Sequence, residues 1–146
     1  MTSYDNVRTI SAAKAVPPAM LSLQWSDGTT AEIDLRVLLR GRAARLLRDP
    51  VAFAGVGLGD WGHSVAWPDG TELGAETLWL ETLSATGRDD VRRFLEWRLR
   101  HGLSLNGAAQ ALGLSRRMVA YYSNGEKKIP RAILLACRGW EADQAA

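Results

Sequence analysis

The chain contains only one cysteine, Cys137, among its 146 residues. A single thiol excludes an intramolecular disulfide and every zinc module built on cysteine clusters. No run approaches the roughly 20 apolar residues of a membrane span, and residues 1–10 lack the apolar run of a signal peptide. Apolar residues make up 47% and charged residues 23%, as in globular proteins. We therefore expect a cytoplasmic protein of one ordinary domain or two small ones.

Residues that could carry out catalysis or bind metal are also scarce. His63 lies in a predicted loop near acidic residues, but no nucleophile or second histidine accompanies it in that half of the chain. The glycines of residues 55–59 lack the lysine and the following helix of a phosphate-binding loop. The sequence therefore predicts no catalytic residues, no bound metal and no cofactor, and an enzyme is the least favoured class.

The net charge of +2 conceals an asymmetry between the two halves. Residues 1–86 carry seven Lys/Arg and ten Asp/Glu, a net charge of −3, whereas residues 87–146 carry eleven and six, a net charge of +5. Such an asymmetry points to nucleic acid or another acidic partner for the basic half. We expect one domain over 1–86 and another over 87–146.

The N-terminal half shows the pattern of short strands and tight turns. Residues 20–25 and 30–35 alternate in polarity around an Asp27-Gly28 hairpin signal. A second hairpin is predicted across Asp69-Gly70. Residues 36–47 suggest a helical or irregular crossover, and residues 50–54 and 75–83 suggest two helices. The pattern predicts a small sheet domain with two hairpins and one or two helices, which makes the whole chain α+β.

Several motifs of this half resemble a bacterial family known as domain of unknown function 2442. They are Trp25-x-Asp27-Gly28, Asp34-Leu35, Leu47-Arg48-Asp49-Pro50-x-x-Phe53, Val56, and Trp67-Pro68-Asp69-Gly70 with Leu73 and Leu78. The resemblance covers about residues 7–83. It implies a compact sheet without established enzymatic activity. It also implies a genomic association with antitoxins or accessory regulators, some of which carry a fused helix-turn-helix.

The C-terminal half reads as four helices. The first begins at Asp89-Asp90 and ends before Gly102, and its apolar face is predicted to comprise Val91, Phe94, Leu95 and Leu99. Trp97 is expected to face away from this stripe and to dock on the other domain or on a second subunit. The remaining helices are predicted over residues 104–112, over 115–123, and from Pro130 through a stripe of Ile133, Leu134, Cys137 and Trp140.

The second and third helices, joined by a short turn, are typical of a helix-turn-helix. Gly113 fits a turn position of positive φ, and Ala108 and Ala109 permit a close crossing. The segment 89–140 resembles the lambda-repressor/Cro-like helix-turn-helix family, also called the xenobiotic-response-element type. The resemblance rests on Gly102-Leu103-Ser104, Ala109, Ala111-Leu112-Gly113-Leu114-Ser115-Arg116, Val119, Gly125 and Pro130. The sequence departs from the family pattern at Leu105, Gly107 and Tyr122-Ser123.

The third helix would present its N-terminal part to the major groove of DNA. Ser115, Arg116 and Arg117 are then nearest the base edges, and arginine recognises guanine with two hydrogen bonds. Ala120, Tyr121 and Asn124 are predicted to face outward from the same helix. The residues predicted to contact phosphates are Lys127, Lys128, Arg131, Ser104 and Asn106.

These patterns predict a transcriptional regulator that binds double-stranded DNA as a homodimer. Its N-terminal domain would dimerise or receive a protein partner, and the family resemblance adds the more specific hypothesis of an antitoxin that represses its own operon. The alternative is a protein-interaction adaptor whose helical domain no longer binds DNA. A four-helix packing module without any DNA-binding role remains the simplest competing interpretation.

Overall fold

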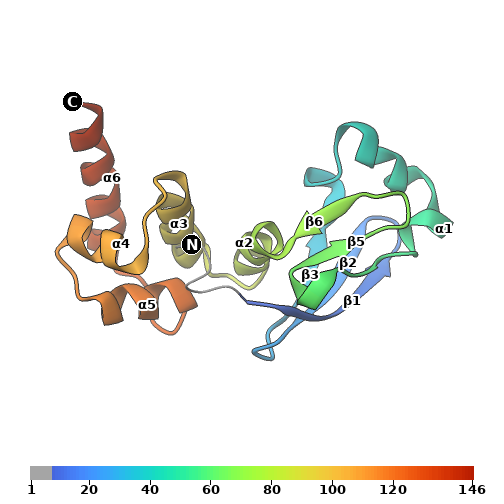
Figure 1. Cartoon of the computed structure of the whole chain (residues 1–146), viewed down its shortest axis with the longest axis horizontal. Helices are drawn as coiled ribbons and strands as arrows, with labels where there is room; N and C mark the ends of the chain where they lie inside the picture. The colour runs from blue at the N-terminus through green and yellow to red at the C-terminus, as the bar shows by residue number, and fades with distance from the viewer. Residues whose placement is uncertain (1–7) are drawn as a thin grey trace. The chain divides into compact units, whose positions relative to one another are not determined.

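The structure, a computed structural model, describes residues 8–146, which divide into two compact units (Figure 1). Arg8–Thr86 contains the strands, and Gly87–Ala146 contains helices only. Each unit buries its own apolar core, so the predicted α+β class is confirmed. The first seven residues of the predicted domain 1–86 lie outside the described residues.

The first sheet consists of three antiparallel strands in the order β1, β2, β3: Ile10–Val16, Met20–Trp25 and Thr30–Asp34. The alternation in β2 is realised, because Leu21, Leu23 and Trp25 are all buried. The hairpin between β2 and β3 was predicted, whereas β1 was missed. The sequence of β1, ISAAKAV, is rich in alanine and lacks the alternation that identifies a half-buried strand.

The second sheet is smaller, with antiparallel strands β4 (Gly57–Leu58), β5 (Ser64–Ala66) and β6 (Glu72–Gly74). The predicted hairpin joins β5 to β6. Helix α1 (Pro50–Phe53) begins where expected, and helix α2 (Ala75–Ala85) follows β6 directly. The predicted crossover consists of 3-10 helical turns, Leu35–Val37 and Gly41–Arg48, and a third such turn spans Asp60–Gly62.

The two Trp-x-Asp-Gly turns have the same hydrogen-bonding pattern. The Asp27 carboxylate accepts a 2.9 Å hydrogen bond from the Thr29 amide, and the Asp69 carboxylate accepts one of 2.8 Å from the Thr71 amide. Each turn glycine has a positive φ, as hairpin turns of this kind require. The pattern in the sequence therefore reflects a repeated local turn geometry.

The tryptophan before each turn is buried and uses its indole nitrogen. Trp25 Nε1 donates a 3.0 Å hydrogen bond to the Thr82 hydroxyl, and Trp67 Nε1 donates one of 3.0 Å to the Phe53 carbonyl. The ring of Trp25 also meets that of Trp79 edge-on, with centroids 5.0 Å apart. These contacts attach the first sheet to α2 and the second hairpin to α1.

The helical unit comprises α3 (Asp89–Arg100), α4 (Leu105–Leu112), α5 (Arg116–Asn124) and α6 (Arg131–Ala145). Helix α3 packs against α5 and α6, and α4 packs against the same two helices (Figure 1). Four helices were predicted for this region, with closely similar limits. Within residues 8–146, no helix is both long and apolar enough to cross a membrane.

The buried face of α3 differs from the prediction. Val91 and Phe94 are buried as expected, but Trp97 is also buried, with only 2% of its surface exposed, whereas Leu99 is exposed. The prediction of an exposed, docking Trp97 is therefore wrong. The indole packs edge-on against Trp140 of α6, with ring centroids 5.6 Å apart. Because α5 and α6 both cover α3, its buried face is wider than a single apolar stripe.

The backbone at Gly113 allows a test of the turn between α4 and α5. Its φ is +69°, and a β-carbon added there would meet no atom within 4 Å. Gly113→Ala should therefore lower the free energy of unfolding by about 1–2 kcal/mol through backbone strain alone. Gly139 in α6 has equally open surroundings but no positive φ. Gly139→Ala should raise stability by about 1 kcal/mol.

Urea denaturation followed by helical circular dichroism would measure both variants. Equal effects of the two substitutions would contradict the assignment of a left-handed backbone to Gly113.

Candidate nucleic-acid interface

Helices α4 and α5 are joined by the three residues Gly113, Leu114 and Ser115. Gly113 ends α4 in the left-handed conformation, and the Leu114 amide donates a 3.0 Å hydrogen bond to the Ala109 carbonyl. Ser115 then begins α5, since its hydroxyl oxygen accepts a 3.0 Å hydrogen bond from the Met118 amide. The turn thus satisfies the backbone groups that both helix ends leave unpaired.

The facing sides of α4 and α5 explain their close packing. Ala108 and Ala109 of α4 are buried, as are Val119 and Tyr122 of α5. The Tyr122 ring also meets the ring of Phe94 on α3 edge-on, with centroids 5.8 Å apart. With Val119 and Tyr122 turned inward, the opposite side of α5 faces solvent.

A buried arginine holds the end of α5. Arg98 on α3 is only 6% exposed, and its Nη1 donates a 2.9 Å hydrogen bond to the hydroxyl of Ser123 on α5. Its Nε donates a second, of 3.2 Å, to the carbonyl of Leu103 in the loop before α4. One guanidinium therefore connects α3, this loop and α5.

This role of Arg98 was not predicted from the sequence. A signal was present, because Arg98 lies seven residues after Val91 and four after Phe94, which places it on the buried face of α3. The contact also accounts for Ser123, a departure from the family pattern. Ser123 is buried and supplies the oxygen that Arg98 needs.

The first turn of α5 presents Arg116 and Arg117 to solvent, as predicted. Arg116 makes no side-chain hydrogen bond or ion pair with the part of the chain that the structure describes. Arg117 Nε donates a 2.7 Å hydrogen bond to the Tyr121 hydroxyl. Lys127 Nζ lies 5.2 Å from the centre of the Tyr121 ring. Tyr121 thereby holds two cationic side chains, Arg117 and Lys127, beside the exposed face of α5.

The other predicted DNA contacts come from the same helix and its neighbours. Lys128 and Arg131 are exposed between α5 and the start of α6, and Asn106 is exposed in the first turn of α4. Ala120 and Asn124 of α5 are half-buried, so less of each is accessible than the prediction assumed.

Ser104 and Ser115 act first as helix caps. The Ser104 hydroxyl oxygen accepts a 2.9 Å hydrogen bond from the Gly107 amide, just as Ser115 accepts one from Met118. A capping hydroxyl keeps its proton, which it can still donate to a phosphate oxygen. Among residues 8–146, no group of three or more His, Cys, Asp or Glu side chains could hold a metal ion.

A search of solved structures finds a likeness along most of the chain. The chain is 42% identical in sequence to the putative DNA binding protein NE0471 from Nitrosomonas europaea. It superposes on the crystal structure of that protein with a TM-score of 0.71. The match covers 93% of this chain and 88% of the other. The chain belongs to the same family as this protein.

No family model and no curated protein matches the chain. The resemblances to domain of unknown function 2442 and to the lambda-repressor/Cro-like family therefore stay predictions. Membership of the NE0471 family covers both units, since the match extends over 93% of the sequence.

The Arg98 contact predicts a specific loss of stability. Arg98→Met should lower the free energy of unfolding by about 2–3 kcal/mol, because it removes charge-assisted hydrogen bonds and leaves the Ser123 hydroxyl buried without this donor. Arg100→Met is the matched control on the same helix, because Arg100 is largely exposed in its ion pair with Glu141. The control should cost about 1 kcal/mol or less.

A double-mutant cycle with Ser123→Ala isolates the contact. Additive losses in the Arg98→Met, Ser123→Ala double variant would show that the two side chains do not interact.

Proposed function

We propose that this protein is a transcriptional regulator that binds double-stranded DNA through its helical unit. The observation that carries the proposal is the exposure of Arg116 and Arg117 at the start of α5, the second helix of a helix-turn-helix. This is the part of such a motif that enters the major groove. The family relative in Nitrosomonas europaea, itself described as a putative DNA binding protein, supports the same function.

The two arginines differ in their freedom to read bases. Arg116 is exposed and unpaired among the described residues, so its guanidinium is available to the O6 and N7 atoms of a guanine. Arg117 is held against Tyr121 by their 2.7 Å hydrogen bond. We assign base recognition chiefly to Arg116, and assign Arg117 with Lys127, Lys128 and Arg131 to the phosphates.

A homodimer is part of the proposal. One recognition helix covers only a few base pairs, so a helix-turn-helix protein gains specificity by pairing two half-sites about 34–36 Å apart. The regulator would then bind a two-fold symmetric operator, and sedimentation of the DNA complex would give its stoichiometry. A single copy bound to a complete site would contradict this part of the proposal.

The division of roles predicts two different effects on DNA binding. Arg116→Ala should weaken binding to the upstream region of its own gene by about 1–3 kcal/mol while leaving binding to unrelated DNA nearly unchanged. The double variant Lys127→Ala, Lys128→Ala should weaken binding to both. It should also reduce the slope of log affinity against log salt by about 2.

Fluorescence anisotropy over a series of salt concentrations measures both effects. Arg42→Ala, at an exposed arginine of the N-terminal unit, is the control and should change neither quantity. An unchanged salt slope in the lysine variant would contradict the phosphate contacts.

A protein partner for the N-terminal unit is favoured by Trp61. Its side chain is 88% exposed. Among the described residues other than glycine, Trp61 alone has a positive φ, of +59°. A bulky residue in this conformation is strained, and such strain is concentrated at functional sites. Leu58, three residues earlier on β4, is also exposed. We propose that Trp61 inserts into a partner protein, in the antitoxin hypothesis the product of the adjacent gene.

Trp61→Gly separates function from stability. Glycine tolerates a positive φ, so the variant should be more stable than the parent by about 1 kcal/mol. It should nevertheless lose binding to the purified product of the adjacent gene, which titration calorimetry would measure. Val37→Ala is the control, because it removes an exposed apolar side chain elsewhere in the same unit and should leave binding intact. Unchanged binding by Trp61→Gly would contradict the proposal.

A further inference from the structure

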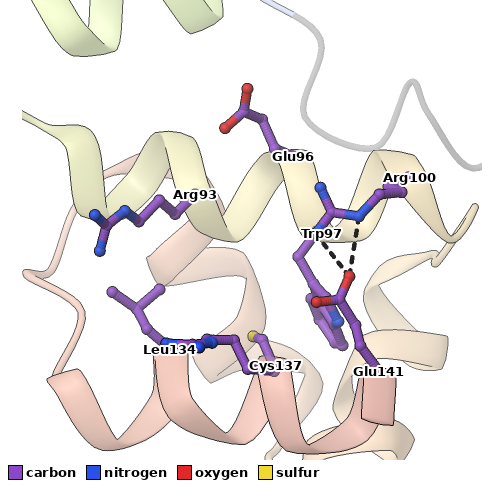
Figure 2. A pocket seen from close by; sticks show the side chains of 8 residues that line it. Arg93, Glu96, Trp97, Arg100, Leu134, Cys137 and Glu141 are labelled. Carbon is purple, nitrogen blue, oxygen red and sulfur yellow. Dashed lines mark hydrogen bonds and ion pairs between the residues drawn. The ribbon is translucent and has the colours of Figure 1, made fainter. Parts of the chain in front are cut away.

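A cavity of about 270 Å³ lies between α3 and α6 in the helical unit (Figure 2). Its walls come from these two helices only. Trp97, Leu134 and Cys137 form the apolar part of the lining, and the rest is charged. None of the side chains assigned to DNA binding lines this cavity, so it is a separate feature of the unit.

The acidic residues of the lining already have cationic partners. Glu141 accepts hydrogen bonds from Arg100, with Nη2 at 2.7 Å, and lies 2.7 Å from His101 Nε2. His101 and then Arg100 lower the pKa of the Glu141 carboxyl, so it stays charged at neutral pH. Glu96 pairs with Arg92 at 3.3 Å. Neither carboxylate is therefore left to neutralise the remaining arginines of the cavity.

Two arginines of the lining are unpaired within residues 8–146. Arg93 extends over Leu134 at one end of the cavity, and the hydrogen-bonded Arg100 and Glu141 lie at the other (Figure 2). Arg138 follows Leu134 by four residues on α6, which places it on the same face of that helix. The cavity thus carries two unpaired positive charges, those of Arg93 and Arg138, beside an apolar wall.

Trp97, which lines the cavity, carries an unusual polar atom that is itself covered by protein. Its side chain is 2% exposed, and its Nε1 is the one buried side-chain nitrogen or oxygen that lacks a hydrogen-bond partner in the described part of the chain. A buried donor without a partner is costly, and native structures retain few of them. The apolar wall and the two arginines together describe a site for a molecule that is apolar in its body and negatively charged at one end.

We propose that this cavity binds a small carboxylate with an apolar body, of about the size of benzoate. The carboxylate pairs with Arg93 and Arg138, because guanidinium groups bind carboxylates with paired, charge-assisted hydrogen bonds. The apolar body lies against Trp97, Leu134 and Cys137. Polar rims with apolar walls are the usual composition of small-molecule sites.

The cavity wall is also connected to the DNA-binding helix. The Phe94 ring lies 5.7 Å from the ring of Trp97 and 5.8 Å from that of Tyr122 on α5. Arg98, adjacent to Trp97, donates to Ser123 on the same helix. A carboxylate that moves Trp97 would therefore displace groups that position α5. This regulatory consequence rests on the proposed DNA binding, whereas the binding of the carboxylate does not.

Titration calorimetry of the full chain with benzoate, without DNA, tests the site. We expect saturable binding that is about tenfold weaker in Arg93→Gln and in Arg138→Gln, because each loses one charged partner. Leu134→Asn, which keeps the shape of the side chain but removes its apolar character, should also weaken binding. Arg42→Gln is the matched control and should bind benzoate as the parent does.

Two further ligands identify what the cavity recognises. Benzamide has the shape of benzoate without the charge, and inorganic phosphate has charge without an apolar body, so both should bind at least about tenfold more weakly. The proposal would be overturned by an absence of saturable benzoate binding, or by benzoate binding in Arg93→Gln and Arg138→Gln as tight as in the parent. Binding of benzamide or phosphate as tight as that of benzoate would also overturn it.

A DNA titration with and without saturating benzoate tests the regulatory consequence separately. A changed affinity in the parent, absent in Arg93→Gln, supports the connection through Phe94 and Arg98. An unchanged affinity overturns the regulatory role while leaving the calorimetric result intact. Failure of the protein to bind DNA at all would overturn the proposed function and not the carboxylate site.

Discussion

The position of the exposed helix α5 depends on one buried charge, the guanidinium of Arg98. A charged group taken out of water is costly unless its donors are satisfied, and Arg98 meets this requirement with the Ser123 hydroxyl and the Leu103 carbonyl. Because these acceptors belong to α5 and to the loop before α4, the arginine can be satisfied only when three segments occupy their native positions. The interaction thus fixes where α5 lies as well as contributing to stability.

The exposed face of α5 follows from this placement. Val119 and Tyr122 point into the core, so the arginines at the start of the helix necessarily point outward. Tyr121 then orders two of the neighbouring cations through its hydroxyl and its ring. A cationic surface whose side chains are partly ordered before binding loses less conformational entropy when it meets phosphates. The DNA-binding function proposed for this member of the NE0471 family rests on this surface.

The contact between α3 and α6 is packed less completely. Trp97 of α3 packs against Trp140 of α6, but the two helices do not fill the space between them. A cavity lined by two unpaired arginines remains there. Apolar burial alone would favour a filled contact, since close packing is the rule in protein interiors. Phe94 touches both Trp97 and Tyr122, so the helix that forms the cavity wall is also the helix that supports α5.

The local features of this protein were determined by its sequence. Features that depend on residues close together in the chain could be predicted. They are the Asp-Gly turns, the caps at Ser104 and Ser115, the left-handed Gly113 and the limits of the four helices. The outward position of Arg116 and Arg117 followed from the same helical periodicity. Strand β1 escaped prediction because its alanine-rich sequence carries no alternation.

The tertiary structure decided which faces are covered. Trp97 is buried and Leu99 exposed because α5 and α6 approach α3 from two sides, and the sequence of α3 alone does not specify the direction of that approach. Arg98 became the support of α5 for the same reason, since its acceptor at Ser123 lies 25 residues away. Contacts between distant residues depend on how helices pack, and a periodic pattern within one helix does not contain that information.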